Sequence, residues 1–240
     1  MSEEKWQSYS EKEDRLVFNS HEADNYDCWY NTKKGNIVDE IETKTGFELF
    51  QPSTKEKILD VGCGTGNFSI KLAGKGCRVT GVDVAEPMLE KARRKASARG
   101  FDILFYRQNV IDLKFEDDFF DGVISMAAVE FVPDLTRAYR EMKRVVKPGG
   151  KILIGTINRD STWGELYREQ SRSETSVFHH AILRIPEELE KIDRPNLVAT
   201  QECLFIPPDA PEDEISWEEE KRLAGRVRGG FFCILWEIKQ

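Results

Sequence analysis

The stretch LDVGCGTGNF, residues 59–68, places three glycines in alternation with small residues directly after an apolar run. Glycine loses more backbone freedom on folding than any other residue, so such a cluster indicates a tight turn that a ligand approaches closely. The apolar residues 58–61 predict a strand before the turn, and residues 67–73 predict a helix after it. A glycine turn between a strand and a helix is the setting in which such a motif binds a ligand.

Strand and helix patterns alternate around this turn. We predict strands at 58–61, 77–83, 101–106, 120–126 and 151–157, and helices at 67–73, from Pro87 to a stop at Gly100, and at 135–146. Strands separated by helices need crossover connections, which predicts a doubly wound, mostly parallel sheet with ligands at the carboxyl ends of its strands. Two late strands, at 196–205 and 230–238, lack an intervening βα unit and would close the sheet antiparallel. The expected fold is therefore α/β and Rossmann-like, with seven strands and an antiparallel edge strand.

The composition bounds the partners and the compartment. The net charge of −8, from 35 basic and 43 acidic residues, argues against the large basic face that nucleic acid requires. The five cysteines are widely spaced, and no C-x-x-C or His-rich cluster occurs, which argues against a disulfide framework and a metal site. The polar N-terminus is unlike a secretory signal, and no apolar run is long enough to span a bilayer. We expect a cytoplasmic protein with no nucleic-acid partner, no membrane partner and no metal.

The residues around the turn favour one kind of ligand over another. A dinucleotide fingerprint has the pattern G-x-G-x-x-G, but Asn67 stands where its third glycine belongs. The carboxylate of Asp60, ahead of the glycines, would repel a pyrophosphate and suits a cationic ammonium or sulfonium. Asp83 ends the second predicted strand, where an acid can accept hydrogen bonds from ribose hydroxyls, although NAD would use an acid there too. The turn thus predicts a positively charged nucleoside ligand.

The ordered motifs resemble those of the class I S-adenosylmethionine-dependent methyltransferases. The matching segments are DVGCGTG at 60–66, GVD at 81–83, NVIDL at 109–113, FDGVIS at 120–125 and VKPGGK at 146–151. The segment YDCWYNTKKG at 26–35 also resembles a stretch that folds over the cofactor in small-molecule methyltransferases of the quinone-biosynthesis-like type; a packed, amphipathic helix entry is an equal alternative. The resemblance implies S-adenosylmethionine as the cofactor.

The resemblance also implies which residues contact that cofactor. The turn would pack against the methionine part, Asp83 would bind the ribose, Asn109 and Val110 would meet the adenine edge, and Met126 would lie beside the methionine part. Cys63 is expected to pack within the turn without acting as a nucleophile. The complete set of expected cofactor residues is Tyr26, Tyr30, Asp60, Gly62, Cys63, Gly64, Gly66, Asp83, Val84, Met88, Asn109, Val110, Met126 and Ala127.

Methyl transfer from a sulfonium is an in-line displacement, so the protein mainly aligns the two reactants and excludes water. A base is needed only when the acceptor must lose a proton. The candidates for direct roles are Tyr30, Glu130 and His179, with a surface His179–His180 pair as the alternative for the last. Trp163 and Tyr167 would line an acceptor pocket or belong to the core.

The chain is expected to divide into an N-terminal helical cap at 1–50 and a cofactor-binding domain at 51–240, with residues 158–195 as a substrate-side insertion. The favoured function is methyl transfer to a small-molecule acceptor. The alternatives are a methyltransferase that acts on protein or RNA, and a module that binds the cofactor without turnover.

Overall fold

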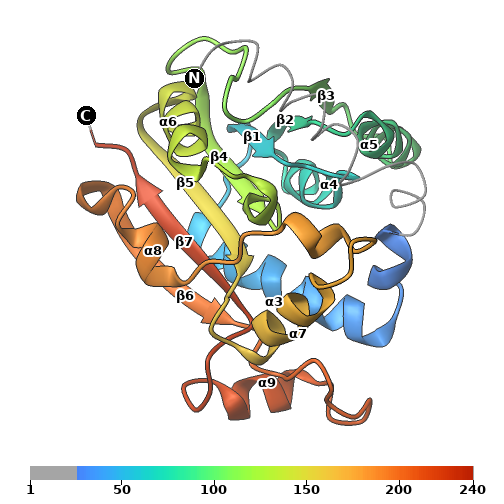
Figure 1. Ribbon diagram of the computed structural model, residues 1–240. Coiled ribbons are helices and arrows are strands. Elements are labelled where there is room, and N and C mark those ends of the chain that lie inside the picture. The colour runs from blue at the N-terminus through green and yellow to red at the C-terminus, as the bar shows by residue number, and fades with distance from the viewer. Residues whose placement is uncertain (1–25, 240) are drawn as a thin grey trace.

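The computed structural model describes residues 26–239, and these contain one seven-stranded sheet in the order β3-β2-β1-β4-β5-β7-β6 (Figure 1). The strands are β1 Lys57–Val61, β2 Arg78–Asp83, β3 Leu104–Arg107, β4 Phe120–Met126, β5 Val146–Ile157, β6 Leu197–Cys203 and β7 Phe231–Glu237. The first five strands pair in parallel, whereas β7 runs antiparallel to both β5 and β6. The predicted doubly wound, Rossmann-like sheet with antiparallel pairing at one edge is confirmed.

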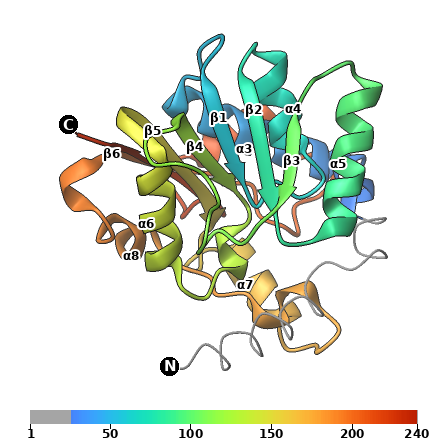
Figure 2. The same cartoon turned by 90° about the horizontal axis from the view of Figure 1, so that it is seen from above.

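Helices cover both faces of this sheet (Figure 2). The helices are α3 Lys33–Phe50, α4 Asn67–Gly74, α5 Glu86–Ala98, α6 Leu135–Val145, α7 Thr162–Gln170, α8 Pro186–Glu190 and α9 Trp217–Leu223, with 3-10 turns η1 Val129–Phe131, η2 Val177–His180 and η3 Arg194–Asn196. On one face α3, α4 and α5 pack against the strands, and on the other α6 and α8 do so. α7 and η2 lie beyond the end at which β5 finishes (Figure 1).

The apolar spacing of the sequence explains how the helices attach to the sheet. In α6 the residues Leu135, Ala138, Met142 and Val145 are buried, as their helical spacing predicts. Asp134 caps this helix by accepting a hydrogen bond from the Arg137 amide. One side of α6 therefore joins the core beneath β4 and β5.

Two strands show differences from the sequence prediction that have a clear structural cause. β5 begins at Val146 and not at Lys151, because Gly149 and Gly150 bond to the backbone of Ile238 and keep the pairing going past Pro148. The register between β4 and β5 shifts at this point. β3 spans only Leu104–Arg107, shorter than the predicted 101–106 at its start, since it pairs with β2 alone.

The first 25 residues of the predicted 1–50 cap lie outside the described residues. Residues 26–30 are helical, and α3 packs along the sheet with Val38, Ile41 and Phe50 buried in the core. Within the predicted insertion at 158–195, α7 and η2 lie at the carboxyl end of β5, whereas α8 contacts β6 and β7. Among residues 26–239, no helix has the length and apolar character needed to cross a membrane.

Candidate cofactor and acceptor site

The glycine turn lies at the carboxyl end of β1, and all three of its glycines have a positive φ: 68° at Gly62, 51° at Gly64 and 79° at Gly66. The amides of Gly62 and Cys63 donate to the Val82 carbonyl at 2.8 and 3.0 Å, which fixes the turn against the end of β2. Left-handed backbone favours glycine at each of these positions.

The three glycines differ in what surrounds them. A Cβ at Gly62 would lie 2.3 Å from the Ala128 Cβ, and one at Gly66 would lie 3.0 Å from the Ala92 Cβ. Among residues 26–239, a Cβ at Gly64 would meet only the Met88 Cε, at an ordinary 3.5 Å. Packing therefore excludes a side chain at the outer two positions, while at Gly64 the space above the backbone is open to a ligand.

Asp83, at the end of β2, holds the middle of the turn. Its carboxylate accepts hydrogen bonds from the Gly64 amide and the Ala85 amide, each at 2.9 Å. Burial raises the pKa of Asp83, and the amides of Ala85, Gly64 and Val84 offset part of that rise. The same carboxylate thus organises the turn from which a nucleoside would be bound.

Asp60 is 2 % exposed and faces the first turn of α4. Its Oδ2 accepts a hydrogen bond from the Ser69 hydroxyl at 2.6 Å. Burial raises the pKa of Asp60 to about 7, with Ser69 opposing the shift and the charge of Asp83 adding to it. A cation placed beside Asp60 would favour its ionised form. Burial also raises the pKa of the Cys63 thiol well above its usual value, which fits the expected packing role.

A pocket that is partly open to solvent lies against this turn. Its lining contains these expected cofactor residues: Tyr26, Tyr30, Asp60, Gly62, Cys63, Gly64, Met126 and Ala127. Thr65, Asn67 and Phe68 also line it, although sequence reasoning did not select them. Ala127 has a φ of 50°, a strained conformation for a residue with a side chain, directly at the pocket.

The other expected cofactor residues are not among those that line this pocket: Gly66, Asp83, Val84, Met88, Asn109 and Val110. Met88 is buried under Gly64, and Val84 is exposed after β2. The Asn109 side-chain oxygen accepts a hydrogen bond from the Ile111 amide at 3.2 Å, so it shapes the loop that follows β3.

The helical segment 26–30 lies over the glycine turn. Asp27 accepts hydrogen bonds from the Thr65 hydroxyl at 2.8 Å and from the Lys95 ammonium at 2.9 Å. Lys95 also donates to Thr65 and to the Asn67 side chain. Burial lowers the pKa of Lys95, and its pairing with Asp27 opposes that shift. This partly buried ion pair fastens the segment to α4 and α5.

Tyrosines and carboxyl groups meet next to this covered turn. The hydroxyls of Tyr26 and Tyr30 lie 3.2 Å apart and share a hydrogen bond. Burial, with smaller contributions from the charges of Glu42 and Glu130, raises the pKa of Tyr26 to about 12, and the hydrogen bond with Tyr30 opposes the shift. Burial is the main cause that raises the pKa of Tyr167, and the charges of the same two glutamates add to it. Glu42, from α3, and Glu130, from η1, thus act electrostatically on both tyrosines.

The structure separates the three candidates for a direct role. Tyr30 lines the pocket, whereas Glu130 is fully buried outside its lining, where its Oε1 accepts a hydrogen bond from the Ile157 amide at 2.9 Å. His179 is not brought to the pocket: it is exposed, contacts the Ser171 carbonyl at 3.0 Å and stacks on His180. The reason is that η2 turns Phe178 inward, against Tyr167 at 4.3 Å between ring centroids.

Glu42 is a buried acid that sequence reasoning did not select. It lies on the buried side of α3 with Val38, Ile41 and Thr45, and this helical spacing was the available signal. Among residues 26–239, no group of His, Cys, Asp and Glu side chains has the arrangement of a metal site.

Comparisons with known proteins agree with this geometry. A family model described as a methyltransferase domain matches residues 59–154. The chain is 31% identical over 223 residues to the uncharacterized protein MJ1123 of Methanocaldococcus jannaschii, which covers 91% of this chain and 97% of that protein. It is 38% identical over 103 residues to a ubiquinone biosynthesis O-methyltransferase of Coxiella burnetii, which covers 43% of this chain and only 44% of that relative's length.

A solved structure shares the fold. The crystal structure of an S-adenosylmethionine-dependent methyltransferase from Thermotoga maritima, described as a possible histamine N-methyltransferase, matches with a TM-score of 0.68 and 22% identity, covering 92% of this chain and 97% of that chain. Sequence motifs, sheet order, family model and full-length relative thus agree, and the chain belongs to the class I S-adenosylmethionine-dependent methyltransferases, with S-adenosylmethionine as its cofactor.

Proposed function

We propose that the protein transfers a methyl group to a small-molecule acceptor in the pocket beside the glycine turn. The observation that carries the proposal is the cover over this turn, which Asp27 fastens to Thr65 and Lys95 and whose tyrosines line the pocket. A pocket covered in this way suits a small molecule better than a folded macromolecule. The similarity to a quinone-modifying O-methyltransferase supports the same acceptor class, and the net charge of −8 counts against RNA.

The residues of the turn fit the cofactor. The open space at Gly64 would receive the methionine part, with Met126 and Ala127 beside it. Asp60, which lines the pocket, supplies a negative charge that would attract a cationic ligand. The same charge would repel a diphosphate. Asp83 would accept hydrogen bonds from the ribose, and the loop of Asn109 and Val110 would meet the adenine edge.

When bound, S-adenosylmethionine supplies a methyl group already activated on a sulfonium. The chain's own residues then have to align the acceptor, and alignment of this kind can lower a barrier by roughly 7–11 kcal/mol. Tyr26 and Tyr30 would exclude water from the reacting atoms. Where the acceptor carries a proton, Glu130 would receive it, because its Oε2 has no hydrogen-bond partner among the described residues.

The direct test is incubation of the purified protein and S-adenosylmethionine, tritiated in the methyl group, with a cell lysate, followed by separation by size. Label should appear in the small-molecule fraction. The Gly64→Val variant is the control, since its side chain would fill the cofactor space, and it should transfer little label. Label confined to the macromolecular fraction would overturn the proposal in favour of a protein or RNA acceptor.

A further inference from the structure

Glu42 is a buried acid that forms no ion pair with another of residues 26–239. Only 8 % of it is exposed, and among residues 26–239 it forms neither a hydrogen bond nor an ion pair. The nearest cation that acts on it, Lys71, is bonded to Asp39 and Thr43, each at 2.6 Å. Burial, Asp39 and Glu130 together raise the pKa of Glu42 well above its usual value. Burying a carboxyl group in this way is costly unless a ligand compensates for it.

Glu130, in η1, is also a buried acid. It is 0 % exposed, and its Oε2 has no partner in hydrogen-bond geometry among the described residues, although the Thr156 hydroxyl is near enough to lower the pKa of Glu130. The nearest cation, Arg184, is occupied by the carbonyls of Val129 and Val132 at 2.9 Å and of Ile182 at 3.1 Å. A fully buried oxygen without a donor is rare in folded proteins and calls for an explanation.

Both carboxyl groups belong to segments that adjoin the cofactor pocket. One helical turn after Glu42, Gly46 approaches Met126, a pocket-lining residue, with 3.3 Å between a Gly46 Cβ and the Met126 Cε. Glu130 follows Met126 by four residues, beyond the end of β4. Both act electrostatically on Tyr26, which lines the pocket itself. The pair therefore belongs to the acceptor side of the cofactor pocket.

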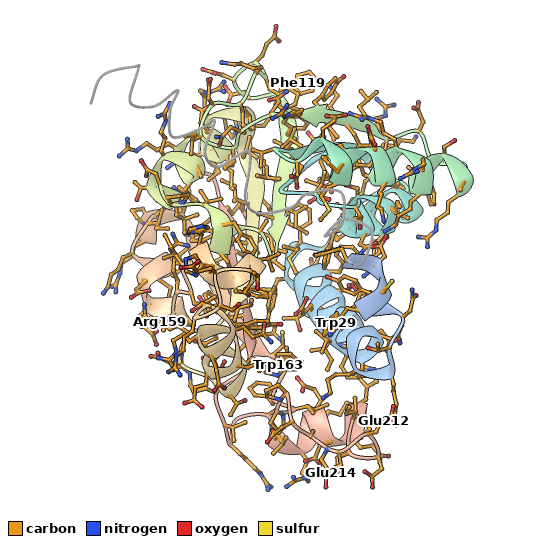
Figure 3. The ribbon with its side chains drawn as sticks, turned by 45° about the vertical axis from the view of Figure 1, so that its right-hand side comes forward. Trp29, Phe119, Arg159, Trp163, Glu212 and Glu214 are labelled. Carbon is orange, nitrogen blue, oxygen red and sulfur yellow. The ribbon has the colours of Figure 1, made fainter. Side chains whose placement is uncertain are left out.

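The remaining surroundings are aromatic. Tyr26 and Tyr30 come from the helical segment that also carries Trp29, and Tyr167 comes from α7, which also carries Trp163. In Figure 3, Trp29 marks the helical segment and Trp163 marks α7, and other side chains lie between these two elements. Tyr167 stacks on Phe178, and Phe178 on Phe131 at 5.9 Å between ring centroids. Aromatic faces and carboxylates are the two groups that attract an organic ammonium.

We propose that Glu42 and Glu130 form a cation-binding pair for the acceptor, and that the acceptor is a protonated amine attached to an aromatic or apolar body. This inference rests on the proposed function and names its substrate class. An anionic acceptor would be repelled by the two acids. A phenol that must lose its proton before attack would place an oxyanion beside them, which is equally unfavourable.

The step balances with the groups at hand. The ammonium gives one proton to Glu130 Oε2, which leaves a neutral amine with a lone pair on nitrogen. That lone pair forms the new nitrogen–carbon bond as the sulfur–carbon bond breaks, and the electron pair of the broken bond stays on sulfur. The products are a methylated ammonium, S-adenosylhomocysteine and the proton on Glu130, which leaves to solvent.

Three probes matched in size test the charge preference: phenethylamine, 2-phenylethanol and 3-phenylpropionate. Each is titrated by calorimetry into the protein saturated with S-adenosylhomocysteine. Phenethylamine should bind roughly ten- to a hundredfold more tightly than the alcohol, the ratio expected for a hydrogen bond to a charged group, and the acid should bind least. Glu42→Gln and Glu130→Gln should each lower the preference for the amine about tenfold or more. Glu165→Gln, the same change on the exposed side of α7, should leave it unaltered.

Three outcomes separate this inference from the proposed function. Binding of S-adenosylhomocysteine without preference for the amine, or a preference that survives both glutamine variants, overturns the amine acceptor alone. Methylation of a catechol but not of phenethylamine by the protein with S-adenosylmethionine does the same. A protein that binds neither S-adenosylmethionine nor S-adenosylhomocysteine refutes the proposed function itself.

Discussion

Replacing Gly64 with alanine separates the demands of the fold from the demands of the cofactor. Gly64 has a φ of 51°, and among the described residues an added Cβ would meet only the Met88 Cε at 3.5 Å. Gly100, at the end of α5, has a φ of 72°, and no atom of residues 26–239 lies within 4 Å of an added Cβ. Gly64→Ala and Gly100→Ala thus carry the same backbone strain, but only the first lies where we place the cofactor.

The magnitudes follow from this geometry. A left-handed conformation costs a residue with a side chain about 1–2 kcal/mol. In a chain of this size each kcal/mol lowers Tm by about 2–4 °C, so both variants should melt about 2–8 °C below the parent protein. A methyl group inserted into a packed contact costs about 1–3 kcal/mol. Only Gly64→Ala should incur that cost on binding, a loss of affinity of about five- to 150-fold.

Calorimetry and thermal melting measure the two effects separately. Gly64→Ala and Gly100→Ala should share a similar Tm, while only Gly64→Ala loses affinity for S-adenosylmethionine. Equal affinity in the two variants would refute our placement of the cofactor over Gly64. Gly62→Ala is a useful contrast, because its Cβ would lie 2.3 Å from the Ala128 Cβ and should lower Tm further than either.

The affinity for S-adenosylmethionine should fall as the pH drops below about 7. Burial raises the pKa of Asp60 to about 7, so at lower pH the cationic cofactor must displace a proton from this carboxyl group. Calorimetry from pH 5.5 to 8.5 should show this dependence of affinity on pH. A dependence that persists in Asp60→Asn would contradict the role assigned to Asp60. Asp27→Asn should speed release of the cofactor, because it removes the ion pair to Lys95 that fastens residues 26–30 over the turn. Stopped-flow measurement gives the dissociation rate, and an unchanged rate would show that the segment does not retain the ligand. Met142→Ala should destabilise the protein by about 2–5 kcal/mol in urea unfolding, since the side chain is fully buried under the sheet; a loss below about 1 kcal/mol would contradict the packing of α6.

Much of the fold could be read from local patterns. The glycine turn, the apolar strands and the helical spacing of α6 each depend on residues close together in the chain. The start of β5 could not be read this way, because Pro148–Gly150 suggests a break and the pairing that overrides it comes from Ile238. β-strand boundaries that depend on a distant partner are not encoded locally.

The candidate site also combines features set by residues close together in the chain with features set by distant residues. Asp60, Gly64 and Asp83 could be predicted because the turn and the strand end that carry them form a continuous pattern. The pairing of Asp27 with Lys95 joins residues 68 positions apart, and the meeting of Glu42 with Glu130 depends on how α3 and η1 pack. A single buried glutamate in a helix gives little signal until the buried side of that helix is known.

The most direct measurement is a crystal structure of the protein with S-adenosylhomocysteine. We predict that its sulfur lies beside Met126 and Ala127, that its ribose hydroxyls bond to Asp83, and that the side from which a methyl would depart faces Glu42 and Glu130. A nucleoside bound away from the glycine turn, or a sulfur directed away from those two carboxyl groups, would contradict the proposed site.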